Sequence, residues 1–193
     1  ILRGEVHFAI GYTEPEAGTD LASLETRAVR DGDEYVINGT KCFTSGAEGA
    51  DYIWLAARTD LERPKHKGIS VFIVDTKLPG FSFTPIEALC VVHTNMTYYD
   101  NVRVPASMLV GALNEGWRLV TAQLSRERIS LAAFSMSGSR YYSAVLAWAR
   151  EQLAEDGRTV AEQPWVQTAM AEAYCRLKAM RLMNARMAAE MDQ

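Results

Sequence analysis

The sequence predicts an α+β protein in which an antiparallel β-barrel or β-sandwich is followed by an antiparallel bundle of helices. The first observation is the distribution of glycine and proline: the chain has 13 glycines and 6 prolines, and 16 of these 19 residues stand at or before Gly116. The second is a series of apolar runs of strand length in that first part, separated by turn residues. The third is a change to a hydrophobic period of three and four residues beyond it. The division falls near Leu113, which gives domains at residues 1–113 and 114–193.

Six apolar runs in the first domain have the length of strands, and no helix-length segment lies between them. Asp31, Gly32 and Asp33 form a hairpin-type turn between two of these runs. Short strands joined in this way favour antiparallel pairing over a parallel sheet. The runs are Val6–Tyr12, Thr26–Arg30, Tyr35–Asn38, Tyr52–Ala57, Ile69–Val74 and Thr97–Val104.

The second domain has the pattern of three helices. Val120, Leu124 and Leu131 recur at helical spacing in the first, and the last begins at Pro164, a residue favoured in a first helical turn. A helix of about 30 residues spans roughly 45 Å, so another element must pack against it. We interpret its Met-rich stripe as bundle core or subunit interface; the stripe comprises Val166, Ala169, Ala173, Leu177, Met180, Met187 and Met191.

Composition excludes several classes of protein. A net charge of −4 gives no basic footprint for nucleic acid, and no apolar run is long enough to span a membrane. Cys42, Cys90 and Cys175 are expected to be reduced thiols, as in a cytoplasmic protein. The three histidines, His7, His66 and His93, have no metal-ligand spacing, and no phosphate-binding glycine motif is present. Because the chain opens at Ile1 and ends at Gln193 within a helical pattern, we expect it to be part of a longer polypeptide.

Several ordered motifs resemble the acyl-CoA dehydrogenase family. Residues 13–20 read TEPEAGTD, close to the family signature T-E-P-x-A-G-[ST]-D, and residues 100–105 read DNVRVP, close to the family's D-x-V-x-V-P. Residues 43–45, FTS, occupy the place of the family's W-I-T flavin segment, and residues 114–117 read NEGW. The resemblance implies a central β-barrel domain and the first helices of a C-terminal bundle. The family's N-terminal helical domain would precede Ile1.

The resemblance also implies FAD as cofactor and an acyl-CoA as substrate. Its flavin-contacting positions fall on two segments, with the expected residues Ile10, Tyr12, Thr13, Gly18, Thr19, Phe43, Thr44 and Ser45. Thr19, Ser125 and Arg128 are the expected substrate-binding residues. No metal site is implied. An electron-transferring flavoprotein would accept the electrons, and the C-terminal helices would form a homo- or heterotetramer.

Glu127 is the candidate catalytic base. At about 100° per residue it shares a narrow stripe with Val120, Leu124 and Leu131, so a carboxylate interrupts an apolar face. Partial desolvation would raise the pKa of such a carboxyl towards neutrality. The position also matches the glutamate of the isovaleryl-type and long-chain branches of the family. Other branches of the family place the base on a later loop, which would lie beyond Gln193. A further alternative is that Glu127 and Arg128 form ion pairs at an interface, each with its own partner.

The expected reaction is α,β-dehydrogenation of the thioester to a 2-enoyl-CoA. The family's R-x-F-G-x-P-I segment is missing, and residues 155–164 read EDGRTVAEQP instead, so its arginine role is not assigned to Arg158. This departure resembles a branch that includes dehydrogenases of sterol side-chain CoA esters, some of them heteromeric. Two alternatives follow: a non-catalytic subunit of such a complex, and another flavoenzyme on the same scaffold, an oxidase or a monooxygenase.

Overall fold

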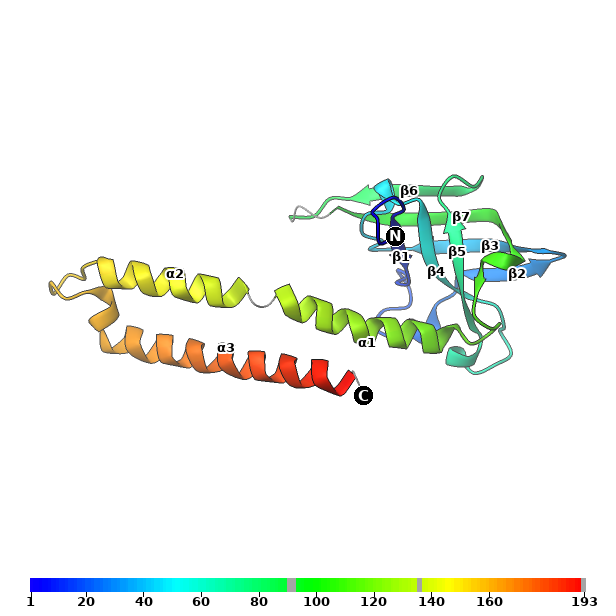
Figure 1. Cartoon of the computed structure of the whole chain (residues 1–193). Coiled ribbons are helices and arrows are strands. Elements are labelled where there is room, and N and C mark those ends of the chain that lie inside the picture. Colours follow the sequence, from blue (N-terminus) through cyan, green and yellow to red (C-terminus); the bar gives the residue numbers. More distant parts are fainter. Residues whose placement is uncertain (90–92, 135–136, 192–193) are drawn as a thin grey trace. The chain divides into compact units, whose positions relative to one another are not determined.

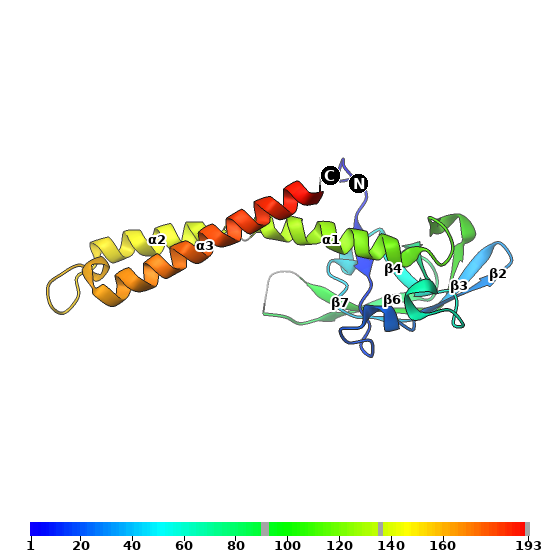
Figure 2. The same cartoon turned by 90° about the horizontal axis from the view of Figure 1, so that it is seen from below.

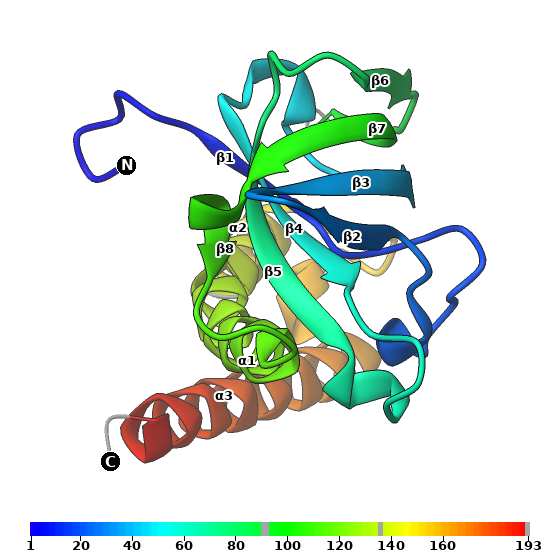
Figure 3. The ribbon, with the colours of Figure 1, turned by 90° about the vertical axis from the view of Figure 1, so that its right-hand side faces the viewer.

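A computed structural model describes residues 1–89, 93–134 and 137–191, which form two compact units, Ile1–Ala122 and Gln123–Gln193. The first unit is built on one eight-stranded sheet (Figure 3). Its neighbour order is β6-β7-β3-β2-β4-β5-β8, and β1 also pairs with β4. The strands are β1 (Phe8–Gly11), β2 (Arg27–Asp31), β3 (Glu34–Lys41), β4 (Tyr52–Arg58), β5 (Ile69–Asp75), β6 (Phe81–Ile86), β7 (Thr94–Pro105) and β8 (Leu109–Val110).

This architecture confirms a strand-rich domain followed by helices, with two differences from the expected antiparallel barrel. Within the described residues the strand order ends at β6 and β8, which do not pair with each other, so the ladder stays open. The pairings β1–β4 and β2–β4 are parallel. In both pairs the two strands are separated in sequence by at least one further strand, so the chain can enter the second strand in the same direction as the first.

All six strand-length runs form strands, and two further strands were not expected. β6 contains Pro85, a residue confined to edge strands because it cannot donate to the ladder, and β6 is indeed an edge. β8 has only two residues. β3 continues past the expected end at Asn38, because a register shift near Gly39 lets the strand bend and pair onward to Lys41.

The core of the first unit lies on the inward face of the central strands. It is formed by alternate apolar residues of β3, β4, β5 and β7 that are fully shielded from solvent: Ile37, Ile53, Leu55, Phe72, Val74, Val102 and Val104. Burial of such side chains is worth about 1.5–3 kcal/mol each. The core fixes the strand ends from which the loops of the candidate site depart.

The described residues form three α-helices, as expected: α1 (Gly116–Phe134), α2 (Ser137–Glu151) and α3 (Pro164–Met191). α2 and α3 lie side by side and antiparallel (Figures 1 and 2), with Gly138 against Leu177 and the rings of Tyr142 and Tyr174 5.9 Å apart. α3 begins at Pro164, as predicted. Its Met-rich stripe ranges from the buried Val166 to exposed positions, and the side chain of Met191 lies outside the described residues, so its assignment to bundle core or interface stays a prediction.

Three observations concern the cysteines, the potential metal ligands and the helices of the described part of the chain. Cys42 and Cys175 are free thiols, and Cys90 lies outside the described residues. Among the residues with assigned positions, no group of three or more potential ligands could hold a metal ion. None of the described helices is long and apolar enough to span a bilayer.

Candidate functional site

The loop at residues 12–20 leaves the sheet where β1 ends. A Cβ at Gly11 would lie 2.9 Å from Ile53 Cγ2, so only glycine lets β1 approach β4 this closely. The next residue, Tyr12, is buried, and its hydroxyl oxygen accepts a hydrogen bond from Trp54 Nε1 at 2.8 Å. β4 therefore fixes both the end of the strand and the first side chain of the loop.

Glu14 connects the same loop to β2 and β3. Its carboxylate accepts backbone hydrogen bonds from Glu25 (2.6 Å) and Thr26 (2.9 Å) at the entry to β2. It also lies 2.7 Å from the ammonium of Lys41, at the end of β3. Burial raises the pKa of the Glu14 carboxyl, but the Lys41 charge and these hydrogen bonds outweigh it, and the net shift is downward. Glu14 is therefore an anion at neutral pH.

The second segment, residues 43–45, follows β3 directly and is joined to the first. The Cys42 amide donates to the Thr13 carbonyl oxygen at 2.9 Å. Phe43 has a φ of 57° and a largely exposed ring, 63% accessible. A phenylalanine in the left-handed region is strained, and such strain persists only where surrounding contacts impose it.

Thr44 is the contact that imposes this conformation. It is fully buried, its amide donates to the Asn95 carbonyl at 3.0 Å, and its own carbonyl accepts from Asn95 Nδ2 at 3.1 Å. Its hydroxyl lies 3.3 Å from that of Thr97. In this structure Thr44 positions its exposed neighbours Phe43 and Ser45, and its expected direct contact with a flavin stays a prediction.

The structure thus brings the two expected flavin segments together. Ile10 and Phe43 present exposed apolar surface. Thr13 is half-buried, and its carbonyl oxygen accepts the hydrogen bond from Cys42 that joins the two segments. Gly18, with a φ of 56°, has open space where a Cβ would be, and Thr19 is exposed. These exposed apolar side chains and the open glycine loop are the features from which a flavin site is proposed below.

The expected base, Glu127, and two of the expected substrate residues, Ser125 and Arg128, lie in the second unit, on α1, whereas Thr19 lies in the first unit. Ser125, Glu127 and Arg128 are all exposed. Leu131, on the stripe of Glu127, is also 55% exposed, whereas Val120 in the first unit is buried. Among the described residues neither Glu127 nor Arg128 forms a salt bridge, and the interface ion pairs considered as the alternative stay a prediction.

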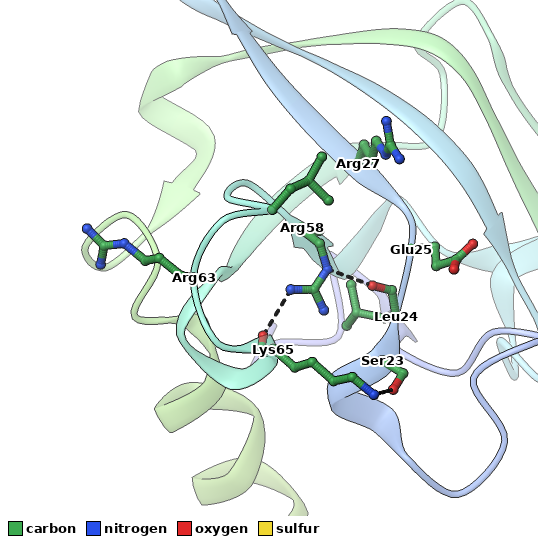
Figure 4. A pocket seen from close by; sticks show the side chains of 8 residues that line it. Ser23, Leu24, Glu25, Arg27, Arg58, Arg63 and Lys65 are labelled. Carbon is green, nitrogen blue, oxygen red and sulfur yellow. Dashed lines mark hydrogen bonds between the residues drawn. The ribbon is translucent and has the colours of Figure 1, made fainter.

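A basic pocket of about 410 Å³ lies beside β2 and β4 (Figure 4). At its wall Arg58, 8% exposed, donates to three carbonyl oxygens: Leu24 (2.9 Å), Lys65 (3.0 Å) and Ala22 (2.5 Å). Two surface loops, residues 20–25 and 60–67, are therefore held by one guanidinium. Sequence analysis did not identify Arg58, because a charged residue at a strand end gives no sign of its orientation.

Comparison with known proteins agrees with the motifs. The family model for the acyl-CoA dehydrogenase middle domain matches residues 9–102, and the model for the C-terminal domain of the same family matches residues 114–193. The chain belongs to the acyl-CoA dehydrogenase family. Members of this family are oxidoreductases that act on the CH–CH bond of acyl-CoA and bind FAD.

Two mycobacterial acyl-CoA dehydrogenases are similar in sequence. Acyl-CoA dehydrogenase FadE29 of Mycobacterium tuberculosis is 64% identical over 150 residues, which cover 77% of this chain and 38% of that protein. FadE26 of the same organism is 45% identical over 190 residues, covering 95% of this chain and 46% of that protein. The chain therefore spans less than half the length of these curated relatives.

Solved acyl-CoA dehydrogenases are similar in fold. A steroid acyl-CoA dehydrogenase, the Tcur3481–Tcur3483 G363A variant, matches with a TM-score of 0.92 and 56% identity over all of this chain and 50% of that one. The ChsE4–ChsE5 complex of Mycobacterium tuberculosis matches with a TM-score of 0.85 and 44% identity, over 97% of this chain and 49% of that one.

The segment that departs from the family motif is well ordered by its own contacts. Asp156 accepts hydrogen bonds from the Arg158 side chain (2.7 and 2.9 Å) and from Gln163 Nε2 (2.9 Å). Hydrogen bonds from Gln163 and Arg158 lower the pKa of Asp156 to about 2. Arg158 is thus engaged within its own loop, and the family arginine's role is not assigned to it.

Sequence reasoning missed the residues beneath the two segments, above all Lys41 and Asn95. A signal for Lys41 exists: Tyr35 and Ile37 point into the core, and Lys41 has the same parity along the strand. A lysine on the inward face of a strand requires a buried partner. The sequence offers several carboxylates as partners, among them Glu14 within T-E-P, and the spacing alone does not pair any of them with Lys41.

Proposed function

We propose that the protein of which this chain is part is an FAD-dependent acyl-CoA dehydrogenase that converts a bulky, steroid-type acyl-CoA thioester to its 2-enoyl-CoA. The observation that carries the proposal is the joining of the two flavin-facing segments by the 2.9 Å Cys42–Thr13 hydrogen bond. Family membership supports the reaction class, and the steroid acyl-CoA dehydrogenase among the similar structures supports the substrate class.

In this proposal the residues of the two segments and of α1 have separate roles. Ile10, Thr13 and Phe43 would flank the flavin ring, and Gly18 and Thr19 would accommodate its pyrophosphate or the thioester. FAD, when bound, would supply the acceptor for the hydride that leaves the β-carbon. Glu127 would take the α-proton onto a carboxylate oxygen, and the electron pair of that C–H bond would form the new double bond.

Three residues are proposed to bind the substrate. Thr19, Ser125 and Arg128 would orient the thioester, with Arg128 available because it has no salt bridge among the described residues. Electrons would pass on to an electron-transferring flavoprotein. The heteromeric complexes among the similar structures favour assembly with other subunits through the C-terminal helices.

A second candidate is a non-catalytic subunit of such a heteromer. Two observations favour it: the similar structures include a two-component complex, and Arg158 is held by Asp156 within its own loop. The presence of flavin and of turnover in the isolated subunit would distinguish it from the dehydrogenase.

The test uses the full-length protein beside its Glu127→Gln variant. Flavin absorbance is recorded first, and acyl-CoA thioesters with straight-chain and steroid side-chain acyl groups are then added anaerobically. We expect both proteins to bind FAD, and the variant to bleach at least about 10²-fold more slowly, as for loss of a positioned base. Glu151→Gln, the same change at an exposed position on α2, is the matched control and is expected to bleach like the parent.

Each other result overturns a defined part of the proposal. Equal bleaching of the parent and Glu127→Gln removes Glu127 as the base. Preference for a straight-chain thioester removes the steroid assignment. A parent without flavin, which bleaches with none of the thioesters, favours the non-catalytic subunit.

A further inference from the structure

Lys41 is the most completely buried charged residue described in the first unit. Its side chain has no solvent exposure, and that of its partner Glu14 has 6%. A buried ion pair is not in itself stabilising, because desolvation of two charges offsets their attraction, and apolar residues of similar size often do as well. The pair therefore calls for an explanation beyond packing.

Its hydrogen bonds join three stretches of chain. Lys41 Nζ donates to Glu14 Oε1 at 2.7 Å and to the Tyr12 carbonyl oxygen at 3.0 Å. The Glu14 carboxylate in turn accepts the backbone amides of Glu25 and Thr26. The loop at 12–14, the entry to β2 and the end of β3 thus meet at a single pair of charges.

Both flavin-facing segments begin at this junction. The first departs at Tyr12, whose carbonyl Lys41 holds, and the second begins two residues after Lys41 with the strained Phe43. An apolar pair could fill the same space, but it could neither accept hydrogen bonds from two backbone amides nor donate one to the loop carbonyl.

We propose that Glu14 and Lys41 are a positioning pair that fixes the two flavin-facing segments relative to each other. The proposal rests on the function proposed above for what those segments bind, while the fixing of the segments is a property of this chain alone. Neither residue touches the cofactor or the substrate in this role. A displacement of about 1 Å in reacting geometry can cost about 10²-fold in rate, so the pair would act through the position of its neighbours.

The charge state supports this arrangement near neutral pH. Burial lowers the pKa of Lys41 to about 8, against the opposing effect of Glu14, so the ammonium is present at pH 7. The other charged or titratable groups that act on it are the Cys42 thiol and the more distant Arg58. Above pH 8 the ammonium would lose its proton, and with it the ion pair that holds the loop.

The experiment compares full-length parent, Lys41→Met and Glu14→Gln by amide hydrogen exchange at pH 7 and by FAD affinity. Lys41→Met keeps the length of the side chain and removes its donors. Glu14→Gln is the milder change, because the amide oxygen can still accept a hydrogen bond. Val104→Ala is the control: it truncates an equally buried residue that pairs with Tyr35, at the opposite end of the β3–β7 ladder.

In Lys41→Met we expect exchange at the amides of Glu25, Thr26 and Cys42 to rise at least about 10-fold more than exchange at amides of the β4–β5 pair. FAD affinity should fall about 10-fold or more. Glu14→Gln should show the same pattern with a smaller change. In Val104→Ala, exchange should rise without this local excess, and FAD affinity should be that of the parent.

The proposal is overturned if Lys41→Met shows no local excess of exchange, or if Val104→Ala shows the same excess. It is also overturned if both pair variants fail to fold while the control folds, since the pair would then be a general stabilising element. A parent that binds no FAD contradicts the proposed function, and the exchange measurement still decides whether the pair fixes the segments.

Discussion

Replacing Arg58 by methionine would remove the guanidinium that holds two loops beside the basic pocket. The side chain is 8% exposed and donates to the carbonyls of Ala22, Leu24 and Lys65. A hydrogen bond to a charged group contributes about 1.5–3 kcal/mol, so three bonds set an additive upper range of about 4.5–9 kcal/mol. Because the pocket of about 410 Å³ lets water reach part of this group of carbonyls, we expect a loss of about 3 kcal/mol in the free energy of unfolding.

Urea unfolding of the parent and Arg58→Met measures this loss. Arg27→Met is the matched control. Arg27 lines the same pocket (Figure 4), and its exposed side chain has no hydrogen bond or salt bridge to the described residues. Its replacement should change the free energy of unfolding by less than about 0.5 kcal/mol. A loss below about 1 kcal/mol in Arg58→Met would show that the loops are held by other contacts and would refute the reasoning.

Three further predictions concern single positions. Gly11→Ala should lower the free energy of unfolding by about 1–3 kcal/mol in thermal or urea unfolding, since its Cβ would lie 2.9 Å from Ile53; no change would show that β1 can shift away from β4. The pKa of Asp156 is lowered to about 2, so its contribution to stability is present above its ordinary pKa of 3.8 and is lost as the pH falls towards 2. Asp156→Asn should remove that part of the acid dependence, measured as unfolding midpoints between pH 2 and 5. An unchanged acid profile in the variant would contradict the prediction. The pKa of Lys41 is about 8 in the folded chain and 10.5 in the unfolded chain, so the unfolded chain binds more protons between these values. The free energy of unfolding therefore rises with pH in that window, by up to about 1.4 kcal/mol per pH unit. Lys41→Met should lack this slope in unfolding curves between pH 8 and 10.

The order of elements could be predicted because their signals are local. Strand-length runs between turn residues gave six strands, and Pro164 gave the start of α3. β6 was missed because its proline weakens a strand pattern, and β8 because two residues carry no periodicity. The open ladder and its two parallel pairings were missed for a different reason: the direction in which β1 and β2 return to β4 depends on the path of long connections, which local pattern does not specify.

The sequence predicted the two segments of the candidate site, but not the buried residues that hold these segments in place. The motifs marked residues 12–19 and 43–45, and the structure joins them through Thr13 and Cys42. The partner of Lys41 is 27 residues away in sequence, and nothing in the spacing selects Glu14 over other carboxylates. For Glu127, helical periodicity placed it correctly on α1, but periodicity does not determine what covers that face.

The supports of these loops share one physical arrangement. Lys41, Arg58 and Asn95 lie on three strands of the same sheet, β3, β4 and β7. All three are buried, and each donates to a carbonyl oxygen of a loop. A loop carbonyl close to a core has no ladder partner, and leaving it unpaired would cost about 1–3 kcal/mol. A long polar side chain from the sheet satisfies it and at the same time restricts the loop to one position. The rigidity of the candidate site therefore resides in strand residues, and comparison of loop motifs identifies the segments that would face a ligand but not the residues that hold them.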